Sequence, residues 1–164
     1  MRKINTLQKV NVVSIQLVKE KSLSYGSKQI NCPRDAAIIA GDFLDGADRE
    51  HFVVICLDTK NNVNALNTVS VGTLNSSLVH PREVFKAAIL ANSNALILSH
   101  NHPSGDPTPS REDVEITKRL AEAGKIMGIE VIDHVVIGES GKYVSFKERG
   151  ILQEAEFNSD GECG

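Results

Sequence analysis

Apolar residues along the chain follow two kinds of spacing, which separate predicted strands from predicted helices. Continuous apolar runs of strand length predict three buried strands, at residues 51–58, 95–98 and 129–137. Apolar residues that recur every three or four positions predict three helices, at residues 33–46, 81–91 and 110–128. Helices and buried strands that mingle in this way are typical of a single domain built on one sheet.

The last of these helices has the clearest apolar pattern. Its predicted buried face, spaced by four, three and four residues, consists of Ile116, Leu120, Ala123 and Met127. Asp113 lies three residues before this face begins, at its edge. We therefore expect Asp113 to point toward the body of the domain.

Weaker patterns complete the predicted domain. Turn-forming residues precede residues 63–71, which predicts a hairpin, and residues 143–146 predict a last strand. Residues 10–18 alternate at Val13, Ile15 and Leu17, which predicts a half-buried strand, and residues 147–153 predict a short helix. Both hairpin-like and helix-mediated connections occur, so the predicted fold class is α/β (or α+β) with one mixed β-sheet flanked by helices.

The chain of 164 residues is long enough for one domain with a sizeable core. We expect an N-terminal strand and loop over residues 1–31 and the single domain over residues 32–153. The acidic segment at residues 154–164 is predicted to be a disordered tail.

Charge and composition narrow the range of partners. The formal net charge is −3, and no basic stripe is present, so DNA binding is possible but has no electrostatic support. No secretion signal and no apolar run of membrane-spanning length is seen. We therefore expect a cytoplasmic protein with no membrane partner, and the sequence indicates no particular oligomeric state.

The three cysteines, Cys32, Cys56 and Cys163, are widely spaced and include no C-x-x-C pair. This spacing argues against both a disulfide framework and a thiolate zinc site. Cys56 lies within an apolar run and is predicted to be a small buried hydrophobic residue.

His100 and His102 stand one residue apart at the end of a predicted strand, and a turn-rich loop leads from them to Asp113. Residues i and i+2 of extended backbone point the same way, so both imidazoles can approach one ion. Two imidazoles and a carboxylate can hold a catalytic zinc ion that keeps its fourth position for water. Ser110 and Asp113 also match a capping box, so both residues could instead be structural.

These positions read His-x-His-x7-Ser-x2-Asp and resemble, position for position, the motif of the JAMM (MPN+) zinc metalloproteases. The segments HNHPSGDPTPS, DHVVIG, PREVFKAAILAN and YVSFKERGIL resemble the RadC family more narrowly, from about Cys32 to about Leu152. The resemblance implies a JAMM/MPN-like domain with Zn²⁺ bound by His100, His102 and Asp113. It also implies hydrolysis of an amide bond in a peptide or protein substrate.

The resemblance further implies a general base, because a glutamate on an earlier strand has that role in the family. Glu50, at the start of the strand predicted at 51–58, is the candidate, and the alternative is an exposed strand-end carboxylate. Ser110 would hydrogen-bond the water or the oxyanion, and its alternative role is the N-cap of the helix. Glu112 is a weaker ligand candidate than Asp113, because adjacent helical residues point about 100° apart.

The remaining histidines, His51, His80 and His134, could line the cleft but are more often packed or capping residues. Asn101, between the two candidate ligands, is expected to point away from the metal and to be structural. Ligating imidazoles need hydrogen-bond partners of their own, which the sequence does not identify.

Three functions are compatible with these residues. The first is a zinc-dependent metallopeptidase or isopeptidase, and the second is a non-enzymatic DNA-repair or mobile-element accessory protein, as the RadC label suggests. Longer RadC proteins carry a helix-hairpin-helix-like domain that residues 1–31 are too short to form. The third is zinc-dependent hydrolysis of another bond, although the H-x-E…P-C-x-x-C signature of deaminases is absent.

Overall fold

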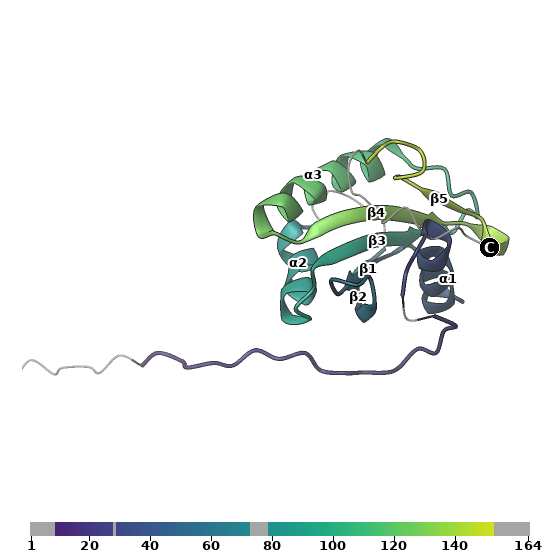
Figure 1. The fold of residues 1–164 in the computed structure, drawn as a ribbon. Helices are drawn as coiled ribbons and strands as arrows, with labels where there is room; N and C mark the ends of the chain where they lie inside the picture. Colours follow the sequence, from purple (N-terminus) through teal and green to yellow (C-terminus); the bar gives the residue numbers. More distant parts are fainter. Residues whose placement is uncertain (1–8, 28, 73–78, 153–164) are drawn as a thin grey trace, which may run out of the picture.

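A five-stranded mixed sheet forms the centre of the molecule (Figure 1). The computed structural model describes residues 9–27, 29–72 and 79–152. The strands lie in the order β2-β1-β3-β4-β5, in which β3 and β4 run parallel and the other neighbours antiparallel. Their bounds are β1 (His51–Leu57), β2 (Val63–Val71), β3 (Ala95–Asn101), β4 (Glu130–Ile137) and β5 (Tyr143–Ser145). The predicted α/β class with a mixed sheet is confirmed.

Helices cover both faces of this sheet (Figure 1). Helix α1 (Pro33–Leu44) packs on one face, and α2 (Pro81–Leu90) and α3 (Arg111–Met127) pack on the other. A single 3₁₀ turn, η1 (Glu139–Gly141), connects β4 to β5. The three helices predicted at residues 33–46, 81–91 and 110–128 are confirmed to within two residues at their ends.

Alternate residues of the central strands enter two separate cores, as the pleat of a strand requires. The β1 residues that pack with α1 are Val53, Ile55 and Leu57. The β1 residues that pack with α2 and α3 are Phe52, Val54 and Cys56. On β3, Leu96 and Leu98 face α2 and α3. The same alternation directs His100 and His102 toward α3.

A bulge in β4 changes which of its residues face α3. Leu96 pairs with Val131, whereas the next residue of β3, Ile97, pairs with Asp133. The extra residue between these pairs reverses the alternation, so Val131 before it and His134 after it both lie on the α3 side.

The strand predicted at residues 10–18 is wrong. Residues 9–27 are extended but pair with no described strand; their first part runs away from the domain (Figure 1), and Leu23 and Tyr25 pack against the core. Val13, Ile15 and Leu17 are 74%, 74% and 49% exposed. Alternation alone does not make a strand when no neighbouring strand accepts its hydrogen bonds. The tail predicted at residues 154–164 lies outside the described residues.

The helix predicted at residues 147–153 is also wrong, because turns take its place over the described part. The buried Asp133 carboxylate accepts hydrogen bonds from the Lys147 N–H at 2.9 Å and the Ser145 hydroxyl at 2.6 Å. These bonds fix the chain in turns just after β5. Met127 was predicted to be buried but is 47% exposed, because it lies in the last turn of α3 before Gly128 redirects the chain.

Cys56 is buried with a free thiol, as predicted, and burial raises its pKa. Cys32 is disulfide-bonded, contrary to the prediction, because spacing along the chain does not reveal which cysteines meet in space. Within the described residues, no helix has both the length and the apolar character needed to cross a bilayer.

Gly124 lets α3 approach the sheet closely, and we expect Gly124→Ala to destabilise the fold by about 1–3 kcal/mol. An added Cβ would lie 2.5 Å from the Ile129 carbonyl oxygen and 3.3 Å from the Phe85 ring. The matched control is Gly41→Ala in α1, where a Cβ would meet nothing within 4 Å. The control should raise stability slightly, since alanine favours helix by about 1 kcal/mol. Urea unfolding of both variants measures the difference, and equal stabilities would contradict the prediction.

Candidate metal centre

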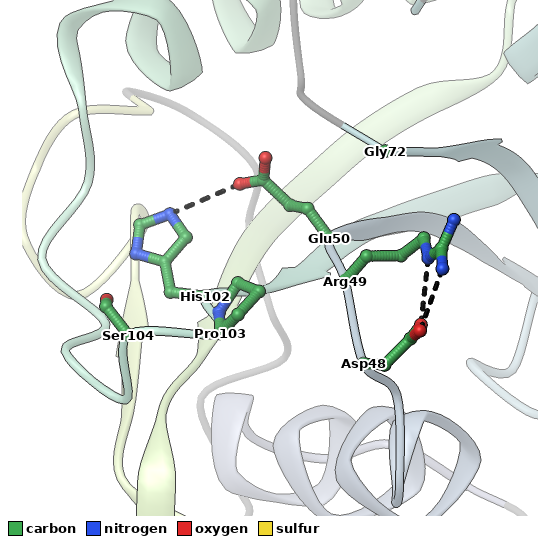
Figure 2. A pocket seen from close by; sticks show the side chains of 7 residues that line it. All are labelled: Asp48, Arg49, Glu50, Gly72, His102, Pro103 and Ser104. Carbon is green, nitrogen blue, oxygen red and sulfur yellow. Dashed lines mark hydrogen bonds and ion pairs between the residues drawn. The ribbon is translucent and has the colours of Figure 1, made fainter.

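Strands β1 and β3 bring Glu50 and His102 to one end of the sheet. Phe52 lies opposite His100 in the antiparallel register, and Glu50 and His102 adjoin this end of β1 and β3. Glu50 Oε1 is 3.8 Å from His102 Nε2 (Figure 2). Both side chains remain partly accessible, at 21% and 15% exposed.

Asp113 approaches the same imidazoles from α3. Its carboxylate oxygens lie 3.3 Å from His100 Nε2 and 3.5 Å from His102 Nε2. The two Nε2 atoms are 2.9 Å apart. Tetrahedral ligands held at zinc distances would be about 3.3 Å apart. The spacing of these three side chains therefore fits one small cation.

Glu50 is the fourth member of the cluster. One ligand atom from each of Glu50, His100 and His102 lies within 4.8 Å of the other two. His100 and Asp113 are buried, whereas Glu50 and His102 face the accessible side. The three side chains predicted to bind zinc are thus together, with the candidate base beside them.

The cluster is electrostatically arranged for a positive charge. Burial alone would raise the pKa of the Asp113 carboxyl, but the adjacent His100 and His102 rings hold that pKa well below its usual value. The neighbouring Asp113 carboxylate raises the pKa of His102 despite burial. Asp113 is therefore ionised at neutral pH and would suit a cationic ligand.

A tight loop orients His102. Its Nδ1 lies 2.7 Å from the Asp106 carbonyl oxygen, which can only accept, so Nδ1 donates, and in the neutral ring Nε2 then presents its lone pair to the cluster. The loop packs against Gly138, where an added Cβ would lie 2.5 Å from the Gly105 oxygen and 2.7 Å from Pro107. Only glycine at position 138 permits this close approach.

Ser110 is the N-cap of α3. Its hydroxyl oxygen accepts the Asp113 N–H at 3.1 Å, and the Asp113 carboxylate accepts the Ser110 N–H at 2.7 Å. The capping alternative is therefore observed. A hydroxyl also has one proton to donate, and capping does not use it. The cap and a hydrogen bond to a bound molecule are compatible.

His134 was not predicted as part of the centre. Its Nε2 lies 2.8 Å from His100 Nδ1, and both rings are fully buried. Thr117 on α3 hydrogen-bonds His134 from the other side. The sequence signal was the Asp133-His134 pair in a strand, but only the bulge in β4 turns this imidazole toward His100.

Asn101 points away from the cluster, as predicted, and fixes the backbone on both sides of Glu50. Its Oδ1 accepts the His51 N–H at 2.8 Å, and its Nδ2 donates to the Arg49 carbonyl at 3.0 Å. The side chain thus ties the end of β3 to the segment that carries Glu50.

Two cavities adjoin the cluster and share His102 and Pro103. The first, of about 670 Å³, has Glu50, Arg49 and Ser104 in its wall (Figure 2). The second, of about 980 Å³, runs between α1 and the β4–β5 connection. The cluster is therefore reached from a hollowed surface on both sides of the loop.

The other candidates lie apart from the cluster. Glu112 is exposed, although its neighbour Asp113 is buried, as the 100° helical rotation predicts. His51 Nδ1 contacts the Arg49 carbonyl, and His80 caps α2 by accepting the Arg82 N–H. The predicted capping role is confirmed for His80.

Comparison with known proteins places this geometry in a family context. The family model of the RadC-like JAB domain matches residues 30–151. A UPF0758 protein of Desulfitobacterium hafniense (strain DSM 10664 / DCB-2) is 60% identical over 123 residues, or 75% of this chain and 54% of that protein.

More distant relatives carry the same description. A UPF0758 protein of Caldanaerobacter subterraneus subsp. tengcongensis is 54% identical over 121 residues, or 74% of this chain and 52% of that protein. One from Geobacillus sp. (strain WCH70) is 49% identical over 152 residues, or 91% of this chain and 67% of that protein. The chain spans about half the length of the first two relatives.

Proposed function

The chain belongs to the family of RadC-like JAB domains, and from that membership and its metal-ligand cluster we propose that it is a zinc-dependent hydrolase of amide bonds. The observation that carries the proposal is the meeting of two imidazole nitrogens and a buried carboxylate within 3.5 Å, with Glu50 on the accessible side. Two histidines and one carboxylate are a ligand set of known zinc peptidases.

His100, His102 and Asp113 would hold the zinc ion through their Nε2 atoms and a carboxylate oxygen. When bound, zinc supplies Lewis acidity, which polarises a carbonyl oxygen and lowers the pKa of water. The ionised Asp113 offsets the charge of the ion, and its burial keeps competing water away from that side.

Glu50 would act as the general base. Its carboxylate would take a proton from the attacking water and return it to the leaving nitrogen as the carbon–nitrogen bond breaks. Its position at the wall of the 670 Å³ cavity lets it reach a substrate and the cluster together. Ser110 would donate its unused hydroxyl proton to the oxyanion that forms on the substrate carbonyl.

The proposed substrate is a peptide or protein segment in extended conformation. The two cavities lie on either side of Pro103 and could take chain on both sides of a scissile bond. This arrangement suits a metallopeptidase or an isopeptidase. A DNA-directed role has less support, because the net charge is −3.

The test combines metal analysis with a substrate screen. Purified protein loaded with zinc and dialysed should retain about one zinc per chain. It should cleave members of an internally quenched peptide library or lysine-isopeptide conjugates, and chelation should abolish the cleavage. Protein that retains no zinc, or a zinc-loaded protein that cleaves neither substrate class, would overturn the proposal.

Asn101 offers a separate prediction, because it fixes the backbone around Glu50 without touching the cluster. We expect Asn101→Ala to lower kcat about 10- to 100-fold, since misplacing a catalytic group by 1 Å can cost that much. Zinc content should not change. The control is Asn64→Ala, which removes a comparable side-chain hydrogen bond, from Asn64 Nδ2 to the Ala91 carbonyl oxygen at 3.0 Å. Loss of zinc in Asn101→Ala, or an unchanged kcat, would contradict the prediction.

A further inference from the structure

A buried chain of hydrogen bonds runs from α3 to the candidate metal centre through two imidazoles. The Thr117 hydroxyl lies 2.6 Å from the Asp113 carbonyl oxygen and also contacts His134 Nδ1. On the far side of its ring, His134 Nε2 lies 2.8 Å from His100 Nδ1. His100 Nε2 then points at the cluster.

The direction of each bond in this chain follows from its one fixed end. A carbonyl oxygen can only accept, so the single Thr117 hydroxyl proton is donated to the Asp113 carbonyl. The contact between Thr117 and His134 therefore requires a proton on His134 Nδ1. In a neutral imidazole, His134 Nε2 is then an acceptor, and His100 Nδ1 must be the donor to it.

We propose that His134 and Thr117 are positioning residues that fix His100 in the tautomer that binds metal. With its proton held on Nδ1, His100 presents an unprotonated Nε2 to the same point as His102 and Asp113. The inference rests on the proposed metal site and adds to it two residues that do not touch the ion. Groups that orient a ligating imidazole commonly have a large effect on metal affinity.

Among the described residues, aromatic rings enclose the His134 side chain. The ring is fully buried and lies against Phe146, with a centroid separation of 4.7 Å, and edge-on to Phe52 at 5.5 Å. Phe52 also stacks on His100 at 6.1 Å. These apolar walls keep water from replacing a lost acceptor.

The experiment measures metal affinity and tautomer in His134→Phe, His134→Gln and Thr117→Val. Phenylalanine keeps the ring but removes the acceptor, whereas the glutamine side-chain oxygen can still accept from His100 Nδ1. We expect the Phe variant to bind zinc about 10- to 100-fold more weakly in competition with a chromogenic chelator. The Gln variant should bind zinc more tightly than the Phe variant and close to wild type, because its oxygen keeps the acceptor that orients His100.

Thr117→Val tests the series of hydrogen bonds at its far end, because valine has nearly the same shape as threonine but no hydroxyl. It frees the proton of His134 to move to Nε2, which would push the proton of His100 onto its metal-binding nitrogen. We expect weaker zinc binding than in Thr117→Ser, which keeps the hydroxyl. Imidazole ¹⁵N NMR of the metal-free protein should show His100 protonated at Nδ1 in wild type and in Thr117→Ser, and not in Thr117→Val.

The outcomes separate this inference from the proposed function. If wild type binds no zinc, the proposed function fails, whereas the NMR tautomer of the metal-free protein still tests the chain of bonds. If wild type binds zinc and the folded Phe and Val variants bind it equally well, the positioning role is overturned. His100 protonated at Nε2 in metal-free wild type would also overturn it.

Discussion

Glu50→Gln is expected to lower the rate of hydrolysis about 10²- to 10⁴-fold, the range over which general bases contribute. The amide keeps the size of the side chain but cannot take a proton from water. Asp113 oxygens lie 3.3–3.5 Å from the two imidazoles, nearer than Glu50 at 3.8 Å from His102 Nε2, so in the proposed site Asp113 is the carboxylate ligand and Glu50 is the base. Zinc content should therefore remain at the wild-type level.

The measurement is kcat on a peptide that wild type cleaves, together with zinc content after dialysis. The control is Glu115→Gln, which removes an exposed carboxylate of α3 that pairs with Arg111 at 3.0 Å. This control should keep full activity. A Glu50→Gln variant as active as wild type would exclude Glu50 as the base, and a variant without zinc would make it a ligand.

Much of this arrangement could be predicted from strand alternation. The continuous apolar runs predicted the central strands. Side chains alternate between the two faces of β3, so His100 and His102 point to the same face as the buried Leu96 and Leu98. The helical periodicity placed Asp113 at the edge of the buried face of α3, and it is 2% exposed. Local patterns were sufficient here because each ligand lies on a regular element.

The remaining parts depend on contacts between segments far apart in sequence. His134 reaches His100 through a bulge, and one extra residue in β4 reverses a prediction based on alternation. The Asn101 side chain makes two hydrogen bonds to the backbone of residues about fifty positions earlier in the sequence. Conversely, residues 10–18 have the alternating pattern of a strand, but they pair with no strand among the described residues. Periodicity describes one element and carries no information about its neighbours.

Asp113→Asn is expected to weaken zinc binding about 100-fold or more, beyond the effect of losing an orienting group. The carboxylate contributes both a ligand oxygen and a negative charge, and the amide removes the charge. In the variant, an NH₂ group would replace one of the carboxylate oxygens that lie 3.3 Å from His100 Nε2 and 3.5 Å from His102 Nε2 in wild type. An N–H donated to either nitrogen occupies the lone pair that would bind metal.

Asparagine is preferable to alanine for this test, because Asp113 also accepts the Ser110 N–H in the capping box at 2.7 Å. The amide oxygen can still make that bond, so α3 should remain capped. Glu112→Gln is the matched control, since it removes the adjacent but exposed carboxylate of the same helix.

Thermal and chemical unfolding with and without saturating zinc measures the effect independently of any substrate. A 100-fold loss of affinity for the folded state removes about 2.7 kcal/mol of zinc-dependent stabilisation. Wild type and Glu112→Gln should show equal stabilisation by zinc, and Asp113→Asn should show at least this deficit. Equal stabilisation of all three would mean that Asp113 is only the cap of α3. The ligand set would then have to be completed by Glu50, the remaining carboxylate beside the two imidazoles.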